Sequence, residues 1–187
     1  MTENGWRDYV FEHAYSAGFN PAVILDSIAS MLPNPGMVEL ITTLDKEGWD
    51  VVLLTDANSV FVNHWLEVHG LQSAVTSVIT NGAFWKNDRL YIEPCMRQTS
   101  CPRCPRNLCK SLALAEWLQS RDYDRIIYSG DGRNDFCPAT VLPAHKGFAE
   151  KSTISNMTYG PKWRTSYFLC TPMSYMGTKC KALKRSI

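Results

Sequence analysis

Two polar segments, each directly after an apolar run, contain the residues best suited to chemistry. One spans residues 54–58 and the other spans residues 129–135. In the second, Asp131 and Asp135 lie on either side of a glycine-rich turn, and two carboxylates close together form an oxygen site suited to Mg²⁺. An Asp-Gly pair by itself commonly marks a turn, so the prediction depends on the groups that accompany it.

A hydroxyl, an ammonium and the backbone N–H groups at a helix start are groups that bind a phosphate. Thr55 supplies a hydroxyl, and Lys110 lies near the start of a predicted helix between the two segments. Their order in the chain, together with the two carboxylates, predicts a site for a phosphate and Mg²⁺.

Strands must bring the two segments together. Residues 50–55, 75–80 and 124–129 are short apolar or β-rich runs. The first is continuous, which is typical of a strand covered on both faces, as in a parallel sheet. Functional groups collect at the carboxyl ends of such strands. We therefore expect the two polar segments at one edge of a sheet.

Stretches with helical spacing precede and separate these strands, at 6–17, 21–31, 36–47, 58–69 and 107–118. Asn107 can cap the last of them, whose apolar face would include Leu112 and Leu118. Alternation of strands and helices predicts an α/β fold with a parallel sheet sandwiched by helices. The aromatic stretch 81–91 predicts a small hairpin or an irregular excursion.

The composition excludes several classes of protein. The 187 residues are 45% hydrophobic and 20% charged, which argues against a disordered chain and a coiled-coil rod. No apolar run approaches the roughly 18–20 residues that cross a bilayer, and the polar residues after Met1 are unlike a secretory signal. We expect a cytoplasmic protein with no membrane partner.

The net charge of +1 conceals two compositions. Residues 1–145 carry 11 Lys/Arg against 17 Asp/Glu, a balance of −6, whereas residues 146–187 carry 8 Lys/Arg against Glu150 alone, a balance of +7. A basic segment can bind nucleic acid, but these charges are dispersed and no RNA-binding signature accompanies them. We predict no nucleic-acid partner and a divergent, basic, weakly ordered tail.

Three of the seven cysteines lie close together in the sequence. Cys101 and Cys104 have the two-residue gap that lets two thiolates reach one zinc ion. A fourth ligand, after Cys109, could come from Cys95, Cys137 or a histidine. A second pair with this spacing is missing, which favours reduced thiols that pack a proline-stiffened loop. Both interpretations stay open.

Three motifs together resemble those of one phosphatase family. They are Thr55-Asp56-Ala57-Asn58, Cys101-Pro-Arg-Cys104-Pro-Arg-Asn-Leu-Cys109-Lys110 and Gly130-Asp131-Gly132-Arg133-Asn134-Asp135-Phe136-Cys137-Pro138. Over roughly residues 6–145 the chain is similar to the phosphoethanolamine/phosphocholine phosphatase and pyridoxal phosphate phosphatase family of the haloacid dehalogenase (HAD) superfamily. The resemblance implies a HAD-like Rossmannoid fold and Mg²⁺-dependent hydrolysis of a small phosphorylated metabolite.

The resemblance also implies a role for each candidate residue. Thr55 would hydrogen-bond the transferring phosphoryl group, and Lys110 would neutralise the phosphate and the nucleophile. Asp131 would coordinate Mg²⁺, Asp135 would be a ligand or would orient one, and Asp56 would contact the substrate.

One motif of the family, Asp-x-Asp-x-Thr after an apolar strand, is not found before Thr55. Its first Asp is the nucleophile of a covalent route. We therefore expect residues 1–32 to be the remnant of a helical cap, residues 33–145 a phosphatase core without its first strand, and residues 146–187 the tail.

A catalytically inactive binding or regulatory variant, or a truncated isoform, is the alternative function. A missing central strand would leave backbone groups unpaired, which predicts low solubility or a partner that fills the gap.

Overall fold

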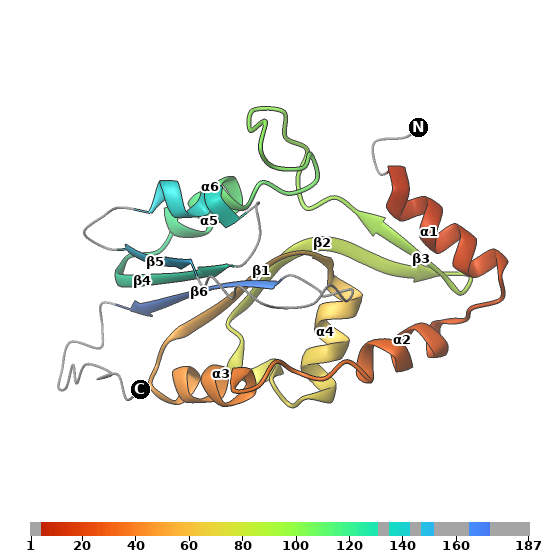
Figure 1. Ribbon diagram of the computed structural model, residues 1–187, viewed down its shortest axis with the longest axis horizontal. Coiled ribbons are helices and arrows are strands. Elements are labelled where there is room, and N and C mark those ends of the chain that lie inside the picture. Colours follow the sequence, from red (N-terminus) through yellow and green to blue (C-terminus); the bar gives the residue numbers. More distant parts are fainter. Residues whose placement is uncertain (1–4, 131–134, 143–146, 152–164, 173–187) are drawn as a thin grey trace.

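The computed structural model describes residues 5–130, 135–142, 147–151 and 165–172. Its strands form one central sheet, and its helices pack around that sheet (Figure 1). In chain order they are α1 (Gly5–Ser16), α2 (Pro21–Ala29), α3 (Met37–Lys46), β1 (Asp50–Asn58), α4 (Ser59–Val68), the 3₁₀ turn η1 (Gln72–Ala74), β2 (Ser77–Lys86), β3 (Arg89–Glu93), α5 (Lys110–Gln119), β4 (Tyr123–Gly130), α6 (Phe136–Val141), β5 (Gly147–Lys151) and β6 (Thr165–Pro172).

Within the described residues, the sheet has six strands in the order β3-β2-β1-β6-β4-β5. β1 and β2 are parallel, and so are β4 and β5. β6 lies between the two pairs and is antiparallel to both β1 and β4. The four strands β1, β2, β4 and β5 therefore run in one direction, and their carboxyl ends lie at one edge of the sheet.

Strand β1 is buried on both faces, as its continuous apolar run predicts. Val52 and Leu54 pack with α5 on one face, whereas Val51 and Leu53 pack with α3 and α4 on the other. Successive side chains of a strand point to opposite faces, so each face of β1 contributes to its own core. The predicted α/β arrangement, a sheet between helices, is confirmed.

The sheet is mixed, whereas the sequence predicted a parallel one. The difference is β6, which lies in the segment 146–187 that was expected to be weakly ordered. Two parts of that segment, 147–151 and 165–172, are strands. Regular alternation with helices was the signal used to find strands, and the sequence shows no such periodicity after about residue 146.

The central position next to β1, where the sequence analysis expected a gap, is therefore occupied by a strand of the same chain. β6 pairs with β1 from Asp50 to Thr55 and with β4 from Tyr123 to Ser129. Backbone N–H and C=O groups at the middle of the sheet thus have neighbours on both sides.

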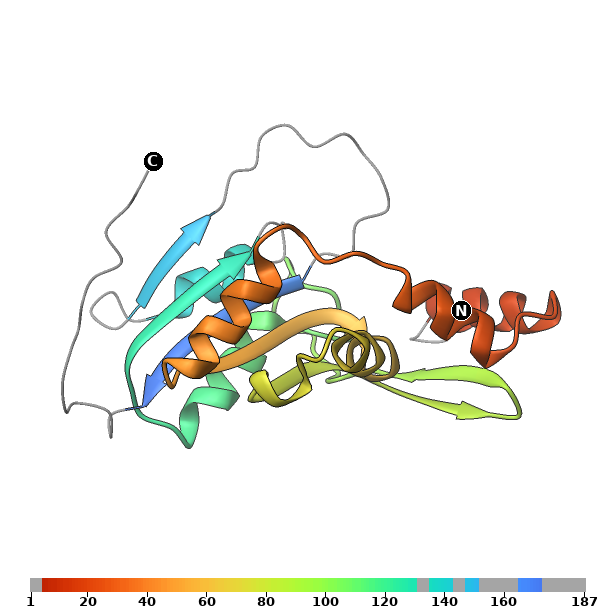
Figure 2. The same ribbon diagram turned by 90° about the horizontal axis from the view of Figure 1, so that it is seen from below.

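The N-terminal helices pack at the opposite side of the sheet from β5. Ile28 of α2 shares a core with Phe61 of α4 and with Leu90 and Ile92 of β3. Figure 2 shows α1 and α2 beside the β2–β3 hairpin. Helices at these positions were predicted; that residues 1–32 form the remnant of a cap stays a prediction.

The aromatic stretch is a hairpin. Asn87 and Asp88 form the turn between β2 and β3, with φ values of 49° and 61°. Asn and Asp tolerate this left-handed region, and two successive positive φ values suit a two-residue hairpin turn.

Helix α5 begins later in the chain than predicted, and a different set of its residues is buried. Its first residue is Lys110, and Cys109 rather than Asn107 precedes it as the cap. Lys110, Ala113 and Leu114 are buried, whereas Leu112 is 43% exposed. The apolar pattern alone did not predict which face of α5 is buried, because Lys110 occupies one position of the buried stripe.

No helix in the described part of the chain combines the length and apolar character needed to cross a membrane.

Pairing of β6 on both sides predicts a large effect of proline in this strand. Cys170 pairs with Asp50 of β1 and with Ile126 of β4. Cys170→Pro removes a backbone donor from a central strand, and we expect it to lower the free energy of unfolding by about 3 kcal/mol, the upper end of the usual range for one substitution. Urea unfolding measures this change.

Cys170→Ala is the matched control, because it keeps the backbone N–H and changes the side chain little. Equal stability of the proline and alanine variants would show that β6 does not contribute to the folded sheet.

Candidate active site

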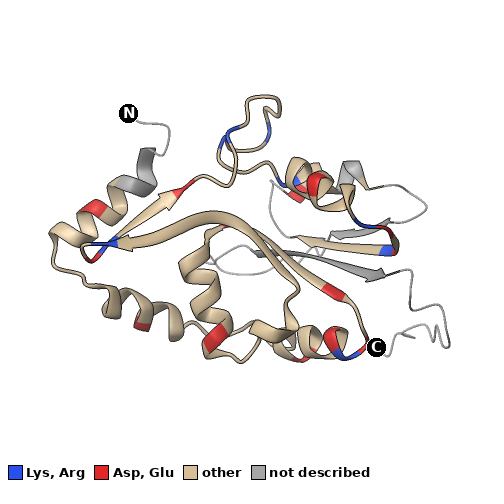
Figure 3. Cartoon of the chain, turned by 180° about the vertical axis from the view of Figure 1, so that it is seen from behind, with Lys and Arg blue, Asp and Glu red and all other residues tan. Residues whose placement is uncertain are grey.

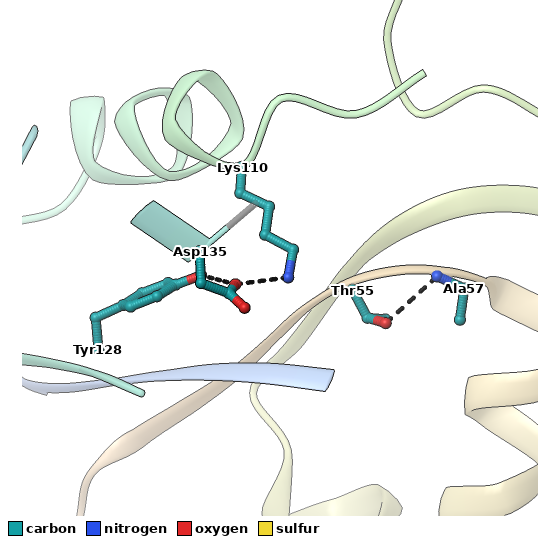
Figure 4. Close-up of polar contacts among 5 residues, drawn as sticks. All are labelled: Thr55, Ala57, Lys110, Tyr128 and Asp135. Carbon is teal, nitrogen blue, oxygen red and sulfur yellow. Dashed lines mark hydrogen bonds and ion pairs between the residues drawn. The ribbon is translucent and has the colours of Figure 1, made fainter. Parts of the chain in front are cut away.

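A buried ion pair lies at the carboxyl end of β4. The ammonium of Lys110 is 2.7 Å from Oδ1 of Asp135, and the Tyr128 hydroxyl donates to the same oxygen at 2.6 Å. The side chains of Lys110 and Asp135 are 1% and 5% exposed. Figure 4 shows Lys110 extending from α5 toward the carboxylate. Charges are buried at this depth only when they are paired.

Three elements position this pair. Lys110 is the first residue of α5, Tyr128 lies in β4, and Asp135 immediately precedes α6. Asp135 packs against Gly130, where a Cβ atom would come within 2.4 Å of the Asp135 Cγ. A side chain at position 130 would therefore displace the carboxylate, which gives a physical reason for glycine there.

Thr55 lies at the same edge of the sheet. Leu53 of β1 and Ser129 of β4 both pair with Tyr167 of β6. They are therefore two strand spacings apart, roughly 10 Å, and Thr55 lies two residues further along β1. Its hydroxyl oxygen accepts a hydrogen bond from the N–H of Ala57 at 3.3 Å, and Thr55 is buried (Figure 4).

Asp56 is held by two asparagines that the sequence analysis did not assign to the site. Asn107 donates to its Oδ1 at 2.7 Å, and Asn81 approaches the same atom at 3.4 Å. Asn107 also donates to Oδ1 of Asn81 at 3.0 Å. The expected helix cap is thus a partner of Asp56.

Asn81 connects β1 to the segment that follows β3. Its amide nitrogen donates to the carbonyl of Ala57 at 2.8 Å, and its oxygen accepts from the N–H of Cys95 at 3.1 Å. Asn81 is fully buried, and a buried amide needs such partners. Asn81-Gly82 resembles a turn in the sequence, so no local signal indicated this role.

The structure thus brings Lys110 and Asp135 together. Thr55 and Asp56 lie at the carboxyl end of β1, at the same edge of the sheet. Tyr128 is an additional member that the sequence analysis missed, because a tyrosine in an apolar strand indicates only a core position. Asp131, the other expected metal ligand, lies outside the described residues.

The comparisons with known proteins bear on this arrangement. A family described as putative phosphatases matches residues 1–155. Pyridoxal phosphate phosphatase PHOSPHO2 of Bos taurus is 35% identical over 169 residues, which cover 81% of this chain and 70% of the relative. The human protein of that name is 34% identical over 170 residues, with coverage of 82% and 70%. This chain belongs to the putative phosphatase family.

A second kind of relative carries another substrate in its name. Human phosphoethanolamine/phosphocholine phosphatase is 33% identical over 147 residues, which cover 74% of this chain and 55% of the relative. No solved structure matches the chain. The phosphatase resemblance inferred from the three motifs is confirmed, and so is the HAD-like α/β fold.

For a phosphatase, the observed groups are chemically suitable. A buried ammonium and a hydroxyl can stabilise negative charge on a phosphoryl group, and electrostatic interactions are stronger where water is excluded. The carboxylate of Asp135 both fixes the ammonium and offers the oxygen chemistry that a hard cation requires. The individual roles predicted for these residues stay predictions.

Loss of the Lys110 ammonium should destabilise the protein more than loss of the Tyr128 hydroxyl. Lys110→Met leaves the Asp135 carboxylate buried without this ammonium, which should lower the free energy of unfolding by about 3–5 kcal/mol. Tyr128→Phe removes one hydrogen bond to a charged group, with an expected cost of about 1.5–3 kcal/mol. Urea unfolding of both variants measures the two changes.

The control is Lys46→Met at the exposed end of α3, where a change below about 1 kcal/mol is expected. If Lys110→Met were no more destabilising than this control, the pair would not be a buried interaction.

Proposed function

We propose that this phosphatase hydrolyses a small phosphate monoester with Mg²⁺, on a substrate of the type named for its relatives: pyridoxal phosphate, phosphoethanolamine or phosphocholine. The observation that carries the proposal is the buried ammonium of Lys110, held by Asp135 at the sheet edge where Thr55 also lies. The remaining support comes from the residues around it.

Lys110 is the group that would bind the phosphate. Its ammonium has three N–H donors, and one of them is directed to Asp135. Its position at the first residue of α5 adds the positive end of the helix dipole, which favours an anion. Charge neutralisation of the transferred phosphoryl group is the main task of a site for phosphoryl transfer.

Thr55 would supply a neutral donor to the same group. Its oxygen already accepts the N–H of Ala57, which leaves the hydroxyl proton available to donate to a phosphate oxygen. Asp56, fixed by Asn107 and Asn81, would contact the substrate from the adjacent position of β1.

Asp131 and Asp135 would hold the cation. Carboxylate oxygens at the carboxyl end of β4 are the donors that Mg²⁺ prefers, and Asp135 is fixed there by Lys110 and Tyr128. When bound, the ion would compensate negative charge on the phosphoryl oxygens.

The loop between β3 and α5 favours an anionic substrate. Arg97, Arg103 and Arg106 are exposed on it, and residues 94–109 contain no Asp or Glu. Its basic positions are blue in Figure 3, next to the start of α5. A surface of one charge raises the local concentration of ligands of the opposite charge.

Phosphate release from the full-length protein tests the proposal. Pyridoxal phosphate, phosphoethanolamine, phosphocholine and an artificial phosphate ester would each be incubated with Mg²⁺ or with EDTA. We expect release that depends on Mg²⁺, and a loss of at least about 10²-fold in kcat for Lys110→Met, as for removal of a group that stabilises transition-state charge.

Lys46→Met is again the matched control and should keep full activity. Binding of a phosphate ester, measured by calorimetry, without release of phosphate from any of these esters would contradict the phosphatase proposal and support the inactive binding variant.

Asp131→Asn tests the proposed metal site by itself. With one carboxylate replaced by an amide, we expect the Mg²⁺ concentration for half-maximal activity to rise about tenfold or more, within the range known for altered metal sites. An unchanged Mg²⁺ titration would exclude Asp131 as a ligand.

A further inference from the structure

Three cysteine sulfurs form a compact group on the loop before α5. The Sγ atoms of Cys101, Cys104 and Cys109 all lie within 4.8 Å of one another. Cys104 and Cys109 are buried, and Cys101 is half-buried. These thiols have no part in the proposed hydrolysis.

A fourth thiol completes this group from a distant part of the chain. The Sγ of Cys137, in α6, is 3.7 Å from the Sγ of Cys101. Cys137 is buried with Cys104 and Cys109 in one cluster. The sequence left Cys95, Cys137 and a histidine open as the fourth ligand, and of these the fold brings Cys137 next to Cys101.

The spacing suits tetrahedral thiolate coordination. Sulfurs at about 2.3 Å from a zinc ion lie about 3.8 Å from one another in a tetrahedron. The Cys101–Cys137 separation of 3.7 Å has this value, and the sulfurs of Cys101, Cys104 and Cys109, which lie within 4.8 Å of one another, are close to it. A sulfur-sulfur distance of this size is well above the roughly 2.05 Å of a disulfide.

The loop that carries three of the thiols is held by its own hydrogen bonds. Gln98 is buried, and its amide accepts the N–H of Cys101 at 2.8 Å and donates to the carbonyl oxygens of Cys104 at 3.2 Å and Pro105 at 2.9 Å. A site whose ligands are already arranged loses less conformational entropy on binding.

We propose that Cys101, Cys104, Cys109 and Cys137 bind one structural zinc ion. Four thiolates that surround the metal leave no open position, which is typical of a structural rather than a catalytic site. Four sulfur ligands in this geometry favour zinc over Mg²⁺ or Ca²⁺, which take oxygen ligands.

The site would fasten the two segments that carry the ion pair. Cys109 immediately precedes Lys110, and Cys137 is two residues after Asp135. The guanidinium of Arg103 also lies over the ring of Phe136 at 5.0 Å, so the loop and α6 already contact each other. A bound zinc ion would fix the positions from which Lys110 and Asp135 meet.

Metal analysis of the full-length protein, purified without chelators, tests this proposal. We expect about one zinc ion per chain. After replacement by Co²⁺, the spectrum should show strong thiolate-to-cobalt charge-transfer bands and the visible bands of a tetrahedral site. A cobalt spectrum without thiolate bands would locate the metal elsewhere, for example at the carboxylates, and would overturn the proposal.

Matched variants assign the ligands. Cys104→Ala and Cys137→Ala should lose the zinc, whereas Cys95→Ala should keep it, because Cys95 packs against a different core. Cys137→His replaces one zinc ligand by another and should retain more metal than Cys137→Ala. If the alanine variants do not fold, removal of zinc from the unmodified protein by a chelator should still lower its melting temperature, and added zinc should restore it.

Three further outcomes contradict the proposal. They are no zinc in the purified protein and none bound after reconstitution, iron in place of zinc, or a Cys101–Cys137 disulfide in the isolated protein. None of them depends on phosphatase activity, so failure of the zinc site and failure of the proposed function are distinguished.

Discussion

Pairing of β6 with β1 and β4 is the constraint on which the rest of the site depends. The ends of β1 and β4 carry Thr55 and the approach to Asp135, and β6 sets their lateral separation at two strand spacings. The pairing also supplies partners for backbone groups at the centre of the sheet, which water cannot reach. One strand therefore links the stability of the sheet to the geometry of the site.

The buried pair of Lys110 and Asp135 is the second constraint. Lys110 occupies a position in the buried stripe of α5, and its charge is tolerated because the carboxylate and the Tyr128 hydroxyl lie within hydrogen-bond distance. The absence of a side chain at Gly130 leaves the space that the Asp135 carboxylate fills. A phosphate-binding site requires a charged group that is held in a fixed position.

Asp56 and two asparagines bring three separate segments of the chain together. Asn81 comes from β2 and Asn107 from the loop before α5, and together they fix the carboxylate at the end of β1. Fully paired, such a network specifies one arrangement of the loops around it. Cys101, Cys104 and Cys109 lie on the same loop as Asn107, whereas Cys137 lies in α6.

The sequence alone predicted the α/β class, because short apolar runs alternate with stretches of helical spacing. It also identified Thr55, Lys110 and Asp135 as candidates, because their motifs are local. It also predicted a small hairpin or an irregular excursion for residues 81–91, of which the hairpin is observed. Only the tertiary structure decided the direction and position of β6 and which face of α5 is buried. It also decided the contacts of Asn81, Asn107 and Tyr128, and the proximity of Cys137 to Cys101. Each depends on contacts between residues far apart in the chain, and local periodicity carries no information about such partners.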